Sequence, residues 1–193
     1  MFLQKGDTIV AIRNAEGIDK IKANIEADFA TFLRLNWFPN AMCVILDGDD
    51  QLPVQRFSDC TPLLSKQDFP VPGSLGSVTT HGGKQSGVFL FPGSGISGTI
   101  EDVLLPIAQR RFSELSEYSR VFVDGWKSRS GDFKELKKPS GLKKAQLSAM
   151  VALLKPGKNT NASLDDQKWI VDPKKCKEIE PLIRFLSAAL AEE

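Results

Sequence analysis

The chain has 193 residues, 41% of them hydrophobic and 25% charged, and its formal net charge at pH 7 is +1. This composition is typical of a soluble globular protein with a core of its own, and the small net charge excludes a global field that attracts nucleic acid or membranes. The sequence has three cysteines and no CxxC pair, which disfavours a disulfide framework and a zinc site. It also has no long apolar run, which disfavours a signal peptide and a membrane span. We therefore expect a cytoplasmic protein.

The first part of the chain predicts a strand, a helix and a second strand. The β-branched run at 8–13 indicates a strand, and apolar residues spaced three or four apart from Ile18 to Phe32 predict a helix. Residues 41–46 are continuously apolar, as expected for a strand covered on both faces. This order of elements predicts a parallel βαβ unit and an α/β sheet.

The middle of the chain adds further elements of the sheet. Residues 52–69 are expected to be partly helical, and strands are predicted at 77–81 and 87–91. A glycine-rich loop, 92–98, follows the last strand.

Beyond this loop the sequence is mainly helical in pattern. Thr99 is a plausible N-cap, and helices are expected over 99–112, 113–126, 142–155 and 176–193, separated by a polar, basic loop at 128–141 and an irregular stretch at 159–172. We therefore expect a single α/β domain over residues 1–193, with a sheet portion at 1–110 and a mainly helical portion at 111–193.

An acidic motif follows the strand at 41–46. Asp47, Asp49 and Asp50 surround Gly48 at the strand's carboxyl end, where binding sites form in open α/β sheets. Two carboxylates two residues apart share a face of extended backbone and suit a hard cation such as Mg²⁺ or Mn²⁺. The alternative interpretation is an exposed turn, since short Asp-rich turns are common.

A second acidic pair, Glu101 and Asp102, begins the helix beyond the glycine-rich loop. If the two apolar strands are neighbours, both acidic clusters face one crevice, where the carboxylates repel each other unless a cation lies among them. On its own the pair is an ordinary charged first turn of a helix. A phosphate cradle in the loop at 93–98 is disfavoured, because the sequence lacks the pattern of a nucleotide-binding loop.

A basic stretch could contact a phosphate backbone, although a solvated loop is the alternative. Its lysines include Lys134, Lys137, Lys138, Lys143 and Lys144. His81 is the only histidine and is expected to be structural, which disfavours a hydrolase triad.

The two acidic motifs resemble those of Toprim-like proteins. They resemble more closely an uncharacterised prokaryotic family related to the nuclease domains of overcoming-lysogenization-defect proteins. In that family an Asp-x-Asp motif ends one strand, and a later strand leads through a proline loop to Gly-x-[Leu/Ile]-Glu-Asp and then to a lysine-bearing helix. The matching residues here are Asp47, Asp49, Pro92, Gly98, Ile100, Glu101, Asp102 and Lys143 or Lys144.

The resemblance implies a Toprim-like, mostly parallel sheet flanked by helices, with a C-terminal helical part. It also implies Mg²⁺- or Mn²⁺-dependent phosphoryl transfer on nucleic acid. By the same likeness Asp47, Asp49 and Glu101 are expected metal ligands, and Lys144 is expected to contact phosphate. Asp50 and Asp102 are expected to be alternate or outer ligands.

Two departures from the Toprim pattern bear on activity. Toprim domains open with a strand that ends in Glu-Gly, but here Glu16-Gly17 lies too close to Asp47, so we interpret the first strand as missing. Gly93-Ser94 also stands where the family commonly has Asp-Asn. The alternative function is therefore a catalytically inactive module that binds a partner protein such as an ATPase.

Overall fold

The computed structural model describes residues 2–5, 8–15, 18–49, 51–93, 95–127, 129, 134–158 and 160–191. Its strands are β1 (Phe2–Lys5), β2 (Thr8–Ala11), β3 (Ala41–Asp47), β4 (Val78–His81) and β5 (Lys84–Phe91). Its helices are α1 (Ile18–Arg34), α2 (Pro53–Ser65), α3 (Glu101–Arg111), α4 (Ser113–Lys127), α5 (Pro139–Leu154), α6 (Thr160–Asp166) and α7 (Glu180–Ala189), with short 3-10 turns at Lys134–Lys137 and Pro173–Lys175. The expected mixture of helices and strands in an α/β fold is confirmed.

The main sheet has the strand order β3-β5-β4. β5 pairs with β3 in parallel, with Asp47 opposite Phe91, and with β4 in antiparallel fashion. β2 pairs with β1 in a separate antiparallel sheet, so the prediction that residues 8–13 form a parallel βαβ unit with β3 is wrong. Pairing with β1 closes a very short connection, which costs less chain entropy than pairing across α1.

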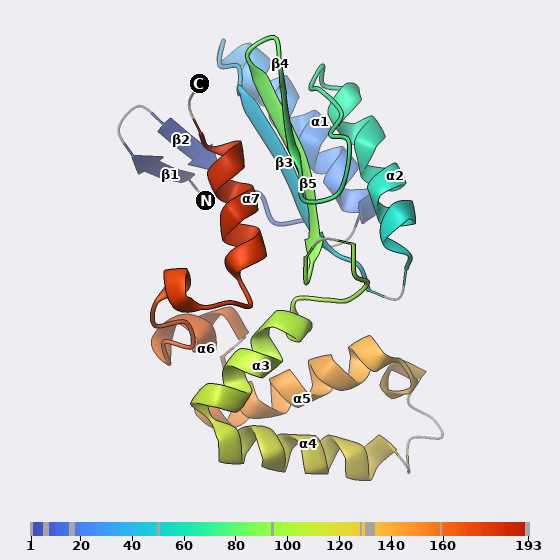
Figure 1. Ribbon diagram of the computed structural model, residues 1–193, viewed down its shortest axis with the longest axis vertical. Coiled ribbons are helices and arrows are strands. Elements are labelled where there is room, and N and C mark those ends of the chain that lie inside the picture. Colours follow the sequence, from blue (N-terminus) through green and yellow to red (C-terminus); the bar gives the residue numbers. More distant parts are fainter. Residues whose placement is uncertain are drawn as a thin grey trace.

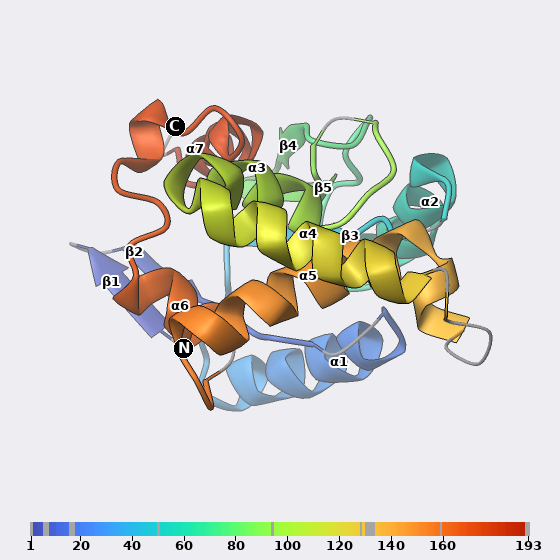
Figure 2. The same ribbon diagram turned by 90° about the horizontal axis from the view of Figure 1, so that it is seen from below.

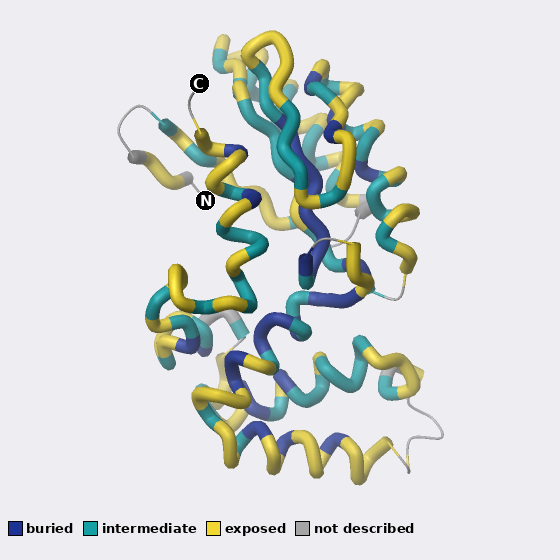
Figure 3. The backbone as a smooth tube through the Cα atoms, in the orientation of Figure 1, coloured by how far each residue is buried: buried dark blue, intermediate teal, exposed yellow. Residues whose placement is uncertain are grey.

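The main sheet is covered on both faces (Figure 1). Val88 of β5 packs with Cys60 and Leu64 of α2 and with Phe29 of α1. Alternate residues of β5 point the opposite way, and Phe89 packs there with Phe185 of α7 in a cluster that continues into α3 and α5. The burial colours of Figure 3 show the dark blue core running down β5 into α3. β5 therefore connects the sheet to the helical part.

The second half of the chain differs in detail from the sequence prediction. α3, α4 and α5 form a helical group below the sheet in Figure 1. The stretch expected to be irregular contains α6, and the terminal helix is shorter than expected, ending at Ala189. The basic loop includes the turn Lys134–Lys137. Among the described residues, no helix combines the length and the apolar character that a membrane crossing requires.

Candidate metal and phosphate site at the sheet edge

β3 and β5 are parallel neighbours, so their carboxyl ends lie at the same edge of the sheet. The loop that leaves β5 crosses the end of β3 and bonds to it. The Asp49 N–H donates to the Gly98 carbonyl at 2.9 Å, and the Ile100 N–H donates to Asp47 Oδ1 at 2.7 Å. The two acidic motifs that the sequence separates by about fifty residues are thus joined by direct hydrogen bonds.

Gly48 makes this crossing possible. A Cβ atom at this position would lie 3.0 Å from the Gly98 carbonyl oxygen and 3.1 Å from the Gly98 nitrogen. These are backbone atoms, which cannot move aside as the end of a flexible side chain can. The close approach of the second loop therefore favours glycine at this position of the Asp-rich motif.

Asp47 is partly buried at the end of β3. Burial raises the pKa of its carboxyl, and the charges of Glu101 and Asp49 raise it further, while the hydrogen bond from the Ile100 N–H opposes the shift. The ionised form of Asp47 is thus disfavoured by its surroundings, as expected for a carboxylate among other carboxylates.

Glu101 is the most informative residue of the site. It begins α3, and only 8% of the residue is exposed. Its Oε2 atom is buried and has no hydrogen-bond partner within the described structure. A buried carboxylate oxygen without a partner loses its hydration and gains nothing in exchange. Glu101 Oε2 is therefore able to accept a hydrogen bond or to serve as a ligand atom.

Two other carboxylates of the site are already paired with cations. Asp49 accepts from Arg56 at 3.3 Å and from Lys144 at 3.2 Å, through different oxygens. The pKa of Lys144 is raised even though desolvation lowers it, because the hydrogen bond to Asp49 and the neighbouring acidic charges outweigh that effect. Lys144 is therefore a firmly charged ammonium group at the acidic edge.

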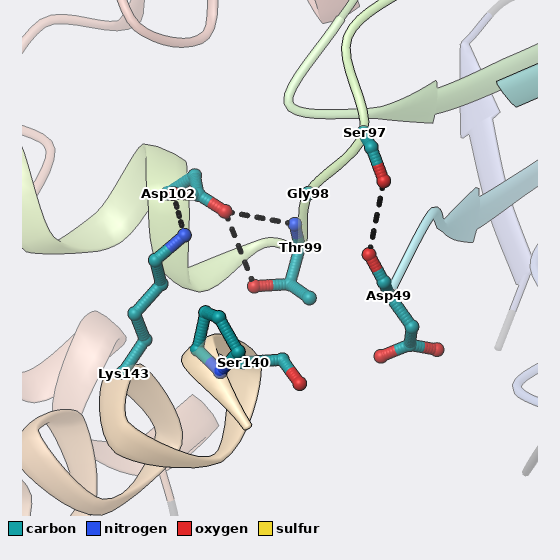
Figure 4. A pocket seen from close by; sticks show the side chains of 8 residues that line it. Asp49, Ser97, Gly98, Thr99, Asp102, Ser140 and Lys143 are labelled. Carbon is teal, nitrogen blue, oxygen red and sulfur yellow. Dashed lines mark hydrogen bonds and ion pairs between the residues drawn. The ribbon is translucent and has the colours of Figure 1, made fainter. Parts of the chain in front are cut away.

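Asp102 contacts α5 and the residue Thr99, which precedes α3. Its Oδ2 accepts from the Thr99 N–H at 3.0 Å, and its Oδ1 accepts from Lys143 at 2.5 Å, as drawn in Figure 4. α3 begins at Glu101, so Ile100 directly precedes the helix and the expected N-cap, Thr99, lies one residue earlier. Asp102 Oδ2 nevertheless accepts the Thr99 N–H, which is the backbone bond of a capping box.

A polar pocket of about 280 Å³ opens beside these residues (Figure 4). Its lining includes Asp49, Ser97, Thr99, Asp102, Ser140 and Lys143. Pro139 and Ser140, which also line it, form the first turn of α5. A helix N-terminus directs backbone N–H groups and the positive end of its dipole outward, so this side of the pocket favours an anion.

The structure brings together Asp47, Asp49, Glu101, Asp102 and two lysines, Lys143 and Lys144, at this edge. In the described ranges, however, no group of three or more His, Cys, Asp or Glu side chains is arranged to hold a metal ion. The expected ligand Asp50 and the alternative first-strand residue Glu16 lie outside the described residues.

The other residues that the sequence singled out lie elsewhere. Lys134 and Lys137 are exposed in the turn before α5, and Lys138 immediately precedes that helix. His81 is exposed at the end of β4.

The cysteines are free thiols. Burial raises the pKa of Cys43 and of Cys60 to about 11, so both thiols are protonated at neutral pH and unsuited to act as nucleophiles.

Residues 2–190 match the model of a family described as a protein of unknown function, DUF3226. The chain belongs to the DUF3226 family. Neither the curated proteins nor the solved structures contain a significant match to it. Membership of DUF3226 agrees with the expectation of an uncharacterised family and assigns no activity.

Sequence reasoning missed several residues of this DUF3226 site. Arg56 lies on α2, seven residues after Asp49, and returns to pair with it. The Ser97 hydroxyl donates to the Asp49 carbonyl at 3.1 Å, as drawn in Figure 4. The same hydroxyl also lies 2.9 Å from the Gln51 carbonyl, and these contacts hold the two loops together. An arginine in a helix and a serine in a glycine-rich loop are too common for either to be recognised from sequence alone.

Proposed function

We propose that this DUF3226 protein binds Mg²⁺ or Mn²⁺ at the sheet edge and performs phosphoryl transfer on nucleic acid, as its resemblance to Toprim-like proteins implies. The observation that carries the proposal is the buried, unpartnered carboxylate oxygen of Glu101. It interacts electrostatically with Asp47, whose ionised form is disfavoured. A hard cation relieves both costs, because it neutralises the repulsion and accepts the unused oxygen as a ligand.

The donor set fits such an ion in its chemistry. Asp47, Asp49 and Glu101 offer carboxylate oxygens only, the ligands that Mg²⁺ prefers. In the arrangement described here Asp49 is engaged by Arg56 and Lys144. Metal binding then requires Asp49 to exchange its ion pair with Lys144 for the cation. Asp50 and Asp102 remain candidates for alternate or outer ligands.

The lysines would bind the phosphate groups of the nucleic acid. Once Asp49 turns to the cation, the ammonium group of Lys144 becomes available to a phosphate oxygen close by. Lys143 and the first turn of α5 line the adjoining pocket and also favour a negatively charged group there. Lys134, Lys137 and Lys138 would extend the contact along a nucleic-acid backbone. The metal, when bound, would polarise the phosphate and lower the pKa of a water or hydroxyl nucleophile.

A second candidate function is a catalytically inactive module that binds a partner such as an ATPase. The ion pairs Asp49–Lys144 and Asp102–Lys143 favour it, because they neutralise two of the carboxylates without any metal. The sequence departure at the first Toprim strand favours it as well. In this alternative the edge of the sheet is a structural network of charges.

The deciding experiment is cleavage of plasmid and single-stranded DNA with Mg²⁺ or Mn²⁺. We expect cleavage by the parent protein to depend on the metal and to be weak at most, because by the resemblance to Toprim domains no first-strand glutamate is matched here. Glu101→Gln should abolish it. Glu180→Gln removes an exposed carboxylate on α7 and serves as the matched control, with activity unchanged. Absence of cleavage by the parent under all conditions would refute the enzyme proposal and leave the binding module.

A further inference from the structure

The outward face of α4 carries several large apolar side chains. Tyr118 is 72% exposed, Val121 54%, Phe122 60% and Trp126 44%. Residues 118, 122 and 126 are four apart, so they lie along one face of the helix. α4 faces the viewer in Figure 2 and forms the outer end of the molecule in Figure 1. These residues therefore form an apolar stripe on an exposed face of α4, which is a candidate interaction surface.

We propose that this stripe pairs with the same stripe of a second copy of the chain, the two α4 helices running antiparallel about a two-fold axis at Phe122. In this arrangement Phe122 lies opposite Phe122 of the second copy, and Tyr118 lies opposite Trp126. An isologous pairing of this kind requires a self-complementary surface. The spacing of the three aromatic residues is symmetric about Phe122 and meets that requirement.

The charges at the ends of α4 select the antiparallel direction. Glu114 lies in the first turn, Lys127 lies in the last, and exposed Arg129 follows, its N–H bonded to the Trp126 carbonyl. Antiparallel pairing places Glu114 of each copy beside the basic end of the other. Parallel pairing would place like charges together, which is unfavourable.

Two further features remove obstacles to this pairing. Arg120 forms ion pairs with Glu117 at 2.6 Å and with Asp124 at 2.9 Å, so the charges on the flank of α4 are largely offset within one chain. Apart from its chain neighbours and the adjacent backbone of α4, a Cβ atom at Gly125 would meet no atom of the described residues within 4 Å. This glycine leaves a shallow place where the Tyr118 ring of the second copy can approach the backbone.

The area available sets the strength of the contact. An aromatic side chain buries about 150–250 Å² when fully covered, so the exposed parts of the three rings offer on the order of 350 Å² per copy. Stable specific interfaces bury about 800 Å² per partner. The pairing is therefore weak and reversible, and the fraction of dimer increases with protein concentration over the micromolar to millimolar range.

Sedimentation equilibrium of the full chain over a concentration series tests the proposal. The parent should show a reversible monomer–dimer equilibrium, and Phe122→Glu should weaken it by at least about tenfold, since it buries a charge at the two-fold axis. Leu33→Glu changes a residue on α1 that is 63% exposed and should leave the equilibrium unchanged. A parent that stays monomeric at millimolar concentration would overturn the proposal.

Two further variant sets test the direction and register. Glu114→Lys or Arg129→Glu alone should weaken dimerisation by about two- to fivefold, and the double swap should restore it. Under oxidising conditions Phe122→Cys should form a disulfide-linked dimer much faster than Tyr118→Cys, because only residue 122 faces its own copy. Failure of the double swap to restore dimerisation, or equal cross-linking of both cysteine variants, would contradict this pairing. None of these residues belongs to the site at the sheet edge.

Discussion

Divalent metal ions should stabilise the folded protein through the carboxylates at the end of β3 and the start of α3. An ion that binds only the folded state increases the free energy of unfolding by RT ln(1 + [L]/Kd). This increase is about 1.4 kcal/mol at 10 mM Mg²⁺ for a dissociation constant of about 1 mM. For a chain of this size each kcal/mol raises Tm by about 2–4 °C, so we expect a rise of about 3–6 °C.

Asp47→Asn is the informative perturbation. The amide oxygen can still accept the Ile100 N–H, now at 2.7 Å from Asp47 Oδ1, while the negative charge is removed. In metal-free buffer at pH 7 the variant should therefore be at least as stable as the parent, because burial and the charges of Glu101 and Asp49 disfavour ionised Asp47. The rise of Tm with Mg²⁺ should be lost in this variant.

The pH dependence follows from the sign of the shift. A carboxyl whose pKa is raised on folding contributes stability that is present at low pH and is lost as the pH rises through its folded pKa. In metal-free buffer, any gain in stability of Asp47→Asn over the parent should thus become smaller as the pH falls below neutrality, because Asp47 of the parent becomes protonated.

Thermal unfolding followed by circular dichroism, with and without Mg²⁺, measures both effects. Asp165→Asn is a suitable control, since Asp165 is an exposed carboxylate on α6, and it should keep the full metal response. An unchanged Tm of the parent in 10 mM Mg²⁺ would refute metal binding in this range. An equal rise in the parent and in Asp47→Asn would show that the ion binds elsewhere.

Three further predictions concern the crossing of the two loops, the ion pair of Arg110 with Glu178, and the proposed nucleic-acid ligand. Gly48→Ala should lower the free energy of unfolding by about 1–3 kcal/mol, measured with urea, because the added methyl meets the Gly98 backbone; an unaffected variant would contradict the close crossing of the two loops. Hydrogen bonds from Arg110 lower the pKa of Glu178 to about 2, so its contribution to stability is present above the ordinary pKa of 4.5 and is lost as the pH falls toward 2. Glu178→Gln should therefore cost up to about 2 kcal/mol at pH 7, after allowance for solvent screening, and progressively less in urea titrations toward pH 3; a cost independent of pH would argue against the ion pair. If single-stranded DNA binds, replacing Lys134, Lys137 and Lys138 by Gln should make the slope of log K against log salt shallower by about 2, and an unchanged slope in fluorescence anisotropy titrations would exclude these lysines from the contact.

The meeting of the two acidic motifs could be expected from the sequence, since it depends only on the pairing of two apolar strands. β3 and β5 are apolar strands, and each is followed by acidic residues within a short distance along the chain. Once such strands pair in parallel, their carboxyl ends must lie at one edge. The parallel pairing of β3 with β5 fulfils that condition.

The local sequence pattern did not determine which strand pairs with β2. The alternation of β2 fits any neighbouring strand, and the sequence contains no signal that distinguishes β1 from β3 as its partner. The start of α3 also differs by one residue from the expected one: the helix begins at Glu101, although Asp102 accepts the Thr99 N–H as in a capping box. Strand partners and helix ends are decided by competition between alternative hydrogen-bond partners in the folded chain.

The sequence by itself determined the class of fold and most helices and strands, since periodicity is a local property of the chain. It predicted the meeting of the two acidic motifs on the condition that their strands are neighbours, and the parallel pairing of β3 with β5 meets that condition. Only the tertiary structure decided the state of each carboxylate. Lys143 and Lys144 reach Asp102 and Asp49 across 41 and 95 residues of sequence, while Glu101 is buried with one oxygen unpartnered among the described residues. Burial and ion pairing depend on which distant side chains folding brings together, because electrostatic interactions act over distance in space.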